Sequence, residues 1–153
     1  MAFGAGQFGG SEFSDDPLMI LEKVNADSLA KPHGYSHAVV ATGSKFVYTS
    51  GQVGIDKESN LVGAERDYRA QGQQAASNVY TALAAAGAKA SDIVRMMMYV
   101  VDPSAENLDQ LYEGLGEAGR EAGAKSTSMV LIGVTALSLP GAVVEFDATA
   151  VID

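Results

Sequence analysis

VVEFDATAV, the stretch from residue 143 to 151, carries the pattern that decides the fold. Its even positions from Val144 to Ala150 are apolar, and they alternate with Glu145, Asp147 and Thr149. Alternation with a period of two predicts a half-buried β-strand. A strand holds a carboxylate more rigidly than a loop does, so Glu145 is the first candidate for catalysis. The alternative interpretation is that both acids are ordinary groups on a solvated strand face.

Periodicity in the rest of the chain predicts five more strands and two helices. An apolar run broken only by Arg95 predicts a strand buried on both faces. Ser104 is the expected N-cap of the second helix. The expected elements are a strand at 20–24, a hairpin of 38–41 with 46–50 around 42–44, a helix at 66–86, a strand at 93–101, a helix at 104–122, and strands at 129–134 and 142–151.

Two helices cannot cover both faces of such a sheet, so we expect an α+β fold with both helices packed on one face. The opposite face then exposes apolar strand residues, which favours association of copies. We therefore expect a closed homo-oligomer in which sheets pack against each other. Clefts form where such sheets meet, and a ligand site between subunits follows.

Composition excludes several classes of function. The chain has 153 residues and a net charge of −9, which argues against binding nucleic acid phosphates or an anionic membrane. It has no cysteine, and its only histidines are His33 and His37, so thiolate and three-histidine metal sites are excluded. We expect a flexible tail over 1–17, of native or vector origin, and a single domain over 18–153. No signal peptide or membrane-spanning run is evident, so we expect a cytoplasmic protein.

Three segments together resemble the RidA/YjgF family of reactive intermediate deaminases. Each motif is weak alone, but their order and spacing cover nearly all of the chain beyond the tail. The motifs are GYSHAV at 34–39 with YTSGQ at 48–52; the helix with Gln71 and Asn78, ending in AAAG at 84–87 before DIV at 92–94; and Gly133-Val134 leading to Leu137, then VEFDATAV at 144–151.

The resemblance implies a chorismate-mutase-like β-sheet with two helices on one face, assembled as a homotrimer whose sheets form a central barrel. It implies a ligand cleft at each subunit interface and no cofactor or metal. It also implies hydrolysis of enamines or imines, such as 2-aminoacrylate, to carbonyl compounds and ammonia.

Family roles carry over to individual residues of this chain. Glu145 is similar to the family glutamate that positions water, and Tyr35 to the tyrosine that closes the cleft. Ser50 and Gly51 are similar to the family Ser-Gly, whose hydroxyl and backbone N–H bind a ligand oxygen. The catalytic set implied is therefore Glu145, Tyr35 and Ser50, with Gly51 binding substrate.

Two further substrate-binding positions depart from the family pattern. Asp109 stands where archetypal members have asparagine. Met129 stands where they have the arginine that grips a substrate carboxylate, and methionine cannot form that charge-assisted pair. We therefore expect a non-archetypal member that is not specialised for 2-aminoacrylate.

Four functions remain to be weighed. The first is an enamine/imine deaminase, and the second is a non-catalytic trimer of the same fold that binds a small metabolite. A third is a deaminase for a neutral or larger substrate, which the methionine at 129 would suit. The fourth, ribonuclease activity, is disfavoured by the acidic composition.

Overall fold

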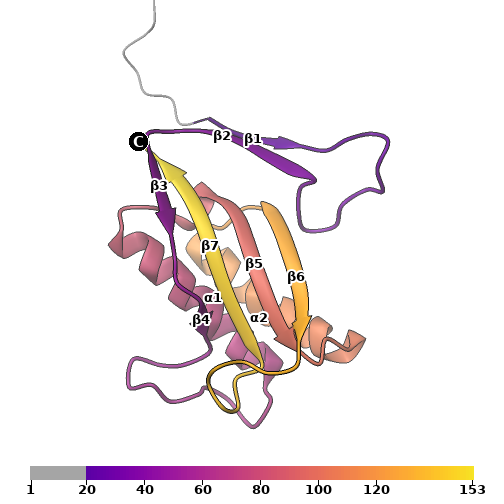
Figure 1. Ribbon diagram of the computed structural model, residues 1–153, viewed down its shortest axis with the longest axis vertical. Helices are drawn as coiled ribbons and strands as arrows, with labels where there is room; N and C mark the ends of the chain where they lie inside the picture. Colours follow the sequence, from indigo (N-terminus) through magenta and orange to yellow (C-terminus); the bar gives the residue numbers. More distant parts are fainter. Residues whose placement is uncertain (1–19) are drawn as a thin grey trace, which may run out of the picture.

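The structure is a computed structural model that describes residues 20–153; the expected tail at 1–17 lies outside this range. The described part forms two sheets and two α-helices (Figure 1). In chain order the elements are β1 (Ile20–Val24), β2 (Ala38–Thr42), β3 (Lys45–Tyr48), β4 (Gln52–Val53), α1 (Tyr68–Ala85), a 3-10 turn (Ala90–Asp92), β5 (Ile93–Val101), α2 (Ala105–Ala122), β6 (Ser128–Val134) and β7 (Val144–Ile152).

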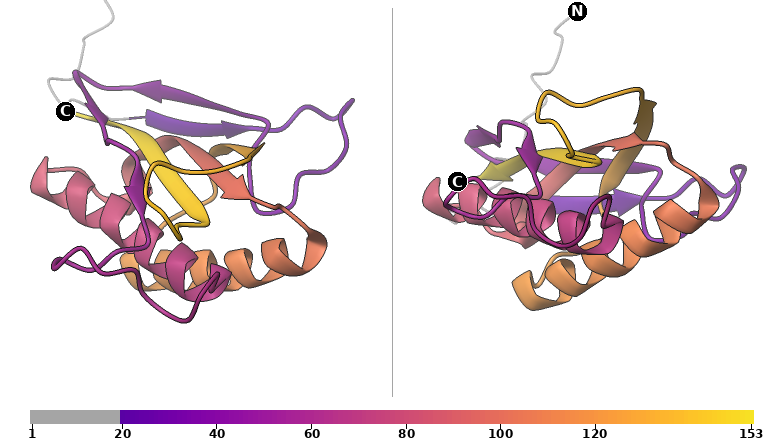
Figure 2. Two further views of the ribbon diagram at one scale, coloured as in Figure 1. Left: turned by 60° about the horizontal axis from the view of Figure 1, so that its bottom comes forward. Right: turned by 90° about the horizontal axis from the view of Figure 1, so that it is seen from below.

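The main sheet has the strand order β3-β7-β5-β6, and the short β4 also pairs with β7. Only β5 and β6 run parallel, and α2 makes the crossover between them. Both helices lie on one face of this sheet, and the opposite face carries no helix (Figures 1 and 2). The predicted α+β fold with two helices on one side is therefore confirmed.

Burial along the two central strands separates the two faces of the sheet. The even-numbered residues from 96 to 100 of β5 and from 144 to 150 of β7, such as Met98 and its partner Phe146, are buried beneath the helices. The odd-numbered residues between them, such as Tyr99 and its partner Glu145, point to the opposite face and are half-buried. This confirms the alternation predicted for β7. The prediction that β5 is buried on both faces fails in the single chain, because no second layer covers the far side.

The expected hairpin between residues 38–41 and 46–50 is wrong. β2 pairs with β1 along its whole length, and β3 pairs with β7 instead. At the junction, Gly43 passes so close to β7 that a Cβ atom there would lie 2.9 Å from the carbonyl oxygen of Ile152. The absence of a side chain lets the chain cross between the sheets, and β1 and β2 form a separate ribbon beyond the main sheet (Figure 1).

Each helix begins after a residue whose side chain caps its first turn. The Asp67 carboxylate caps α1 at the amide of Ala70, and the predicted N-cap Ser104 accepts a bond from Asn107 at the start of α2. The two helices touch closely at Gly114, where a Cβ would lie 2.9 Å from the backbone nitrogen of Gln73. Both helices are therefore fixed tightly against each other over the sheet.

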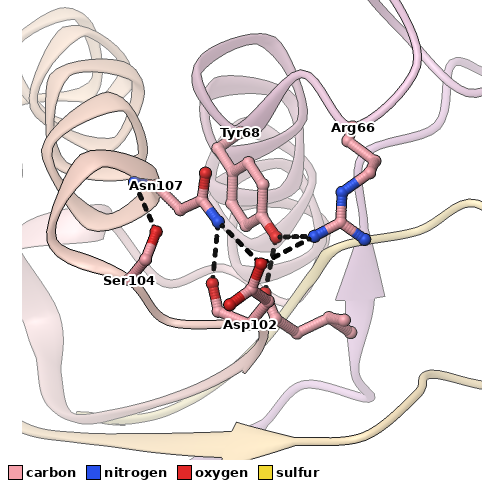
Figure 3. A network of polar contacts seen from close by, with 6 residues as sticks. Arg66, Tyr68, Asp102, Ser104 and Asn107 are labelled. Carbon is pink, nitrogen blue, oxygen red and sulfur yellow. Dashed lines mark hydrogen bonds and ion pairs between the residues drawn. The ribbon is translucent and has the colours of Figure 1, made fainter.

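A polar network joins the start of α1 to the end of β5 (Figure 3). The Tyr68 hydroxyl donates to the carbonyl of Val101 at 2.6 Å and accepts from the Arg66 guanidinium at 2.9 Å. Arg66 also forms an ion pair with Asp102 at 3.2 Å. Arg66 and Asp102 have backbone φ angles of 55° and 49°, a region that side-chain-bearing residues rarely adopt. The network stabilises both strained positions, so Arg66 serves the fold.

Replacing Tyr68 with phenylalanine should destabilise the fold at neutral pH. The change leaves the Val101 carbonyl without its donor and removes a partner of Arg66. A lost buried hydrogen bond of this kind costs about 1–3 kcal/mol of unfolding free energy. Urea unfolding at pH 7 measures it. Tyr80→Phe is the matched control, because no hydrogen bond of the Tyr80 hydroxyl exists within residues 20–153, and its stability should stay close to the wild-type value.

Stability should also fall at alkaline pH. Burial raises the pKa of Tyr80, and burial is also the main cause of the raised pKa of Tyr68, where the Arg66 charge opposes the shift. At pH values between the unfolded and the folded pKa, the folded protein keeps these phenol protons and the unfolded chain has lost them. Unfolding therefore releases protons in this range. The stabilisation is complete below about pH 10 and is lost as the pH rises through the folded pKa values. Thermal melts from pH 8 to 11 should show this decline, and a smaller one in Tyr80→Phe.

Candidate functional site

Glu145 lies on the helix-free face of the sheet, near the start of β7. It pairs with Tyr99 of β5 on one side and with Val53 of β4 on the other. Asp147 lies on the same face, beside Met97. Both carboxylates therefore stand on a central strand held by neighbours on each side, as the alternation of the sequence predicted.

A bulge between β3 and β4 brings backbone towards Glu145. Four residue steps from Tyr48 to Gln52 lie opposite three steps from Thr149 to Phe146, so the outer chain contains one extra residue. Such bulges bend a strand and are frequent beside functional sites. Thr49 fixes the bulge, because its backbone amide donates to the Ala148 carbonyl and its hydroxyl accepts from the Ala148 amide, each at 3.0 Å.

Gly51 lies directly against the Glu145 carboxyl group. A Cβ atom built on Gly51 would sit 2.8 Å from Cδ of Glu145 and 3.1 Å from its Cγ, closer than real contacts allow. Ser50 precedes it with an exposed side chain, and its hydroxyl has no hydrogen-bond partner within residues 20–153. The structure thus places Gly51 in contact with the carboxyl group of Glu145, and Ser50 is the preceding residue of the same bulge.

Adding a methyl group at Gly51 should displace the Glu145 carboxylate. The obstructed atoms are the far end of a flexible side chain, so unfolding free energy should change by less than about 1 kcal/mol. If Glu145 is catalytic, turnover should fall roughly tenfold to a hundredfold in Gly51→Ala, since misplacing a catalytic group by about 1 Å has that cost. Gly133→Ala, at an exposed glycine of β6, is the control and should keep wild-type turnover.

Tyr35 and Met129 lie elsewhere, around a cavity of about 730 Å³ between α2 and the start of β5 and β6. Met129 pairs with Met96 in the row that faces the helices. Tyr35 is 41% exposed and reaches the cavity from the loop that precedes β2. The amide of Ser36 donates to the Thr127 carbonyl at 2.9 Å and holds this loop to the start of β6.

His37 braces the same loop. Its Nδ1 accepts from the Ala26 amide at 3.1 Å, so Nε2 carries the proton and donates to the Ala30 carbonyl at 2.9 Å. The Asn25 side chain accepts from the His37 amide at 3.0 Å. The imidazole therefore organises the loop that presents Tyr35, whose ring lies edge-on at 6.3 Å between centroids.

Asp109 lies on the exposed surface of α2, and the hydrogen bonds and ion pairs within residues 20–153 do not include it. In a single chain, the six candidate residues therefore lie in three separate places. Glu145, Ser50 and Gly51 lie on the helix-free face, Tyr35 and Met129 on the helix side, and Asp109 on the surface. In the single chain, the first two groups lie on opposite faces of the sheet.

The sequence patterns predicted no role for two residues of the site region. Thr49 fixes the bulge, and its only sequence signal is its place in the YTSGQ motif. Arg120 lies on α2 and lines the helix-side cavity. It stands on a polar turn of the helix, so the sequence gives no signal that it borders a cavity.

The described residues contain no group of three or more histidine and acidic side chains arranged to hold a metal ion. Within the same range, neither helix has the length and apolar character needed to cross a bilayer.

Comparison with known proteins agrees with this architecture. A sequence profile described as Endoribonuclease L-PSP matches residues 25–152. Among curated proteins, no sequence matches the chain.

Solved structures extend the comparison. The chain is 34% identical to the Yersinia pestis protein YyfB, described as a Rid family protein of unknown function. That alignment covers 86% of this chain and 98% of YyfB, with a TM-score of 0.76. The Mycobacterium tuberculosis protein Rv2704, of the YjgF/YER057c/UK114 family, is 29% identical over 78% of this chain and 87% of its own, with a TM-score of 0.54.

Escherichia coli TdcF, solved with bound serine, shares the fold at 24% identity and a TM-score of 0.62, covering 88% of this chain and 98% of its own. The profile match, the identity to YyfB and the shared fold agree with the motifs read from the sequence. The chain therefore belongs to the Rid/YjgF family, whose sequence profile carries the description Endoribonuclease L-PSP.

Proposed function

We propose that the protein is an enamine/imine deaminase that works as a homotrimer, with each active site built at an interface between two copies. The observation that carries the proposal is the Glu145 carboxylate, held on a central strand against Gly51, the residue that follows Ser50 in the bulge. Family membership supports the reaction class, and the division of the candidate residues supports a site that needs two copies.

The reaction needs no group beyond water and these side chains. An enamine first tautomerises to the imine, whose C=N carbon is electrophilic. Glu145 holds a water molecule and accepts one of its protons as the water oxygen bonds to that carbon. The Ser50 hydroxyl and the Gly51 N–H stabilise the polar centre that forms. Glu145 returns the proton to nitrogen, which gives a neutral carbinolamine. Glu145 then moves the proton of the carbinolamine hydroxyl to nitrogen, the C–N bond breaks as the C=O bond forms, and ammonia leaves with the carbonyl product.

Tyr35 of a neighbouring copy supplies the other side of this site. Its ring is 41% exposed and its loop is braced by His37 and by the Ser36 amide, so the ring is preorganised for contact. Packed over the bound imine, it limits access of bulk water to the reacting carbon.

Met129 determines which imines suit the protein. In the helix-facing row beside Met96 it offers an apolar surface and no charge-assisted contact to a carboxylate. We therefore propose that the preferred substrate is not 2-aminoacrylate but an imine that is neutral or carries a larger apolar group.

A non-catalytic trimer that binds a small metabolite is the alternative, and the apolar cavity around Met129 favours it. Ribonuclease activity, which the description of the family names, is disfavoured by the net charge of −9, since phosphate binding needs clustered cations.

An imine-hydrolysis assay separates these functions. 2-Aminoacrylate is generated in the cuvette by enzymatic dehydration of serine. Larger apolar imines and carboxylate-free imines are generated by enzymatic oxidation of the corresponding amines, and ammonia release is followed with and without the protein. The deaminase predicts faster release, greatest for the apolar imines. Saturable binding of a small molecule without faster release from any imine supports the alternative and contradicts the proposal.

A further inference from the structure

We infer that three side-chain amides of α1, those of Gln71, Gln74 and Asn78, are positioning residues for Glu145. The three positions share one side of the helix, at spacings of three and four residues. α1 packs against β7, the strand that carries Glu145, and against its short neighbour β4 (Figure 1). The effect on turnover rests on the proposed function, whereas the effect on the position of Glu145 does not.

Gln71 holds the segment that leads into β7. Its Oε1 accepts from the Val143 amide at 2.9 Å, and its Nε2 donates to the Gly141 carbonyl at 3.2 Å. The side chain is only 1% exposed, and an amide is the neutral group that offers an acceptor and a donor at one tip. Val143 lies two residues before Glu145, and its carbonyl accepts from the Val101 amide at 2.9 Å. Gln71 therefore fixes the entry of the strand that bears the carboxylate.

Asn78 holds β4, the strand that pairs with β7 at Glu145. Its Nδ2 donates to the carbonyls of Val53 and Ile55, at 3.0 and 2.9 Å. Val53 is the ladder partner of Glu145. It also follows Gly51, which touches the Glu145 carboxyl group, by two residues. Asn78 therefore fixes the end of the bulge that contacts the carboxylate.

Gln74 acts through Asn78, because its side chain makes no bond to either segment. Its Nε2 donates to Asn78 Oδ1 at 2.9 Å. Backbone carbonyls can only accept, so the Nδ2 of Asn78 must face Val53 and Ile55 while its oxygen faces Gln74. The bond from Gln74 therefore selects the orientation of the Asn78 amide that holds β4.

The two segments held by α1 meet at Glu145. β4 pairs with β7 only at Glu145 and Phe146, and of these two Phe146 is buried beneath the helices. Close approach makes the hold rigid, since a Cβ at Gly54 would lie 2.6 Å from the Cα of Gln71. A shift of either segment would therefore move the carboxylate relative to the bulge.

Gln71→Met and Asn78→Leu keep the size of each side chain and remove its hydrogen bonds. Because a catalytic group misplaced by about 1 Å loses up to about a hundredfold in rate, kcat on the best imine should fall about tenfold to a hundredfold. KM should change little, since the loss falls on the reacting step. Rates are expressed per folded protein, measured by circular dichroism, so that a purely structural role leaves kcat unchanged.

Gln73→Met is the matched control for both variants. It makes the same change on the same helix, and the Gln73 side chain takes part in no hydrogen bond within residues 20–153. It should keep the wild-type kcat. Wild-type kcat in folded Gln71→Met and Asn78→Leu proteins, or an equal loss in Gln73→Met, overturns the inference.

A double-mutant cycle tests whether Gln74 works through Asn78. Gln74→Met removes one hydrogen bond at a half-buried position, so it preserves the fold even if the Gln71 variant does not. It should lower kcat about threefold to tenfold, the value of one such bond. In the Asn78→Leu background it should have no further effect, because its partner is gone. A loss of the same size in both backgrounds would contradict the relay.

A measurement without turnover separates this inference from the proposed function. In protein labelled with ¹³C at the glutamate carboxyl carbons, the NMR signal of Glu145 is identified by its loss in Glu145→Gln. That signal should shift in Gln71→Met and in Asn78→Leu, and it should stay at its wild-type position in Gln73→Met. A signal that stays in place in the folded Gln71 and Asn78 variants overturns the inference, whatever the ammonia assay shows. A shifted signal in a protein that hydrolyses no imine supports the positioning and contradicts only the proposed function.

Discussion

Imine turnover by Glu145→Gln protein should fall by about 10²- to 10⁴-fold, the usual contribution of a positioned general base. The amide keeps the shape of the carboxylate but cannot accept a proton from water. Because Glu145 is half-buried on a central strand and touches Gly51 only with its flexible end, the fold should remain intact. Initial rates of ammonia release on the best imine measure the loss, and melting temperatures check the fold.

Asp147→Asn is the matched control for this change. Asp147 lies two residues along β7 on the same face and pairs with Met97, whereas the backbone of Gly51 lies against the carboxyl group of Glu145. The substitution removes the same charge and preserves the same shape, so turnover should fall less than about tenfold if general-base catalysis belongs to Glu145. Equal losses in both variants would mean that the face needs negative charge and not a base at one position.

Placing glutamates at Phe46 and Tyr48 together should convert the assembly to single folded copies and abolish turnover. These side chains are 61% and 72% exposed in one chain, on the edge strand β3, and Tyr48 shares the row of Thr149 on the helix-free face. Burying each at an interface contributes about 1.5–3 kcal/mol per copy. Two glutamates remove that gain and add the larger cost of burying charge.

Sedimentation velocity and the ammonia assay measure the two consequences together. Leu29→Glu is the control, since Leu29 is 58% exposed in the loop before β2, away from the sheet face. It should leave both the size of the assembly and the turnover unchanged. A double variant that sediments as a single copy and keeps full turnover would show that one chain contains the complete site.

Local patterns of the sequence predicted the elements, because each depends on neighbours in the chain. The alternation at 143–151 and the apolar run at 93–101 correspond to β7 and β5, and Ser104 caps α2 as expected. The hairpin prediction failed because strand pairing is a long-range choice. The apolar residues of β2 fit a pleated partner on either side, and the local sequence does not choose between β1 and β3.

The candidate site was predictable only in part, for a similar reason. Glu145 could be found because alternation places a carboxylate on a rigid strand. The bulge at Thr49 depends on a register between β3, β4 and β7 that no local pattern reports. The cavity beneath α2 depends on which turn of the helix carries Gly116 and Gly119 above β6, and only tertiary packing fixes that.

Mixing two inactive variants tests most directly whether each site is shared between copies. Glu145→Gln and Tyr35→Ala proteins, each nearly inactive alone, are unfolded together at equal amounts and refolded. If Glu145 of one copy works with Tyr35 of its neighbour, random mixing rebuilds about a quarter of the sites, and turnover returns to that fraction of the wild-type value. Turnover that stays at the level of the separate variants would contradict a site built from two copies.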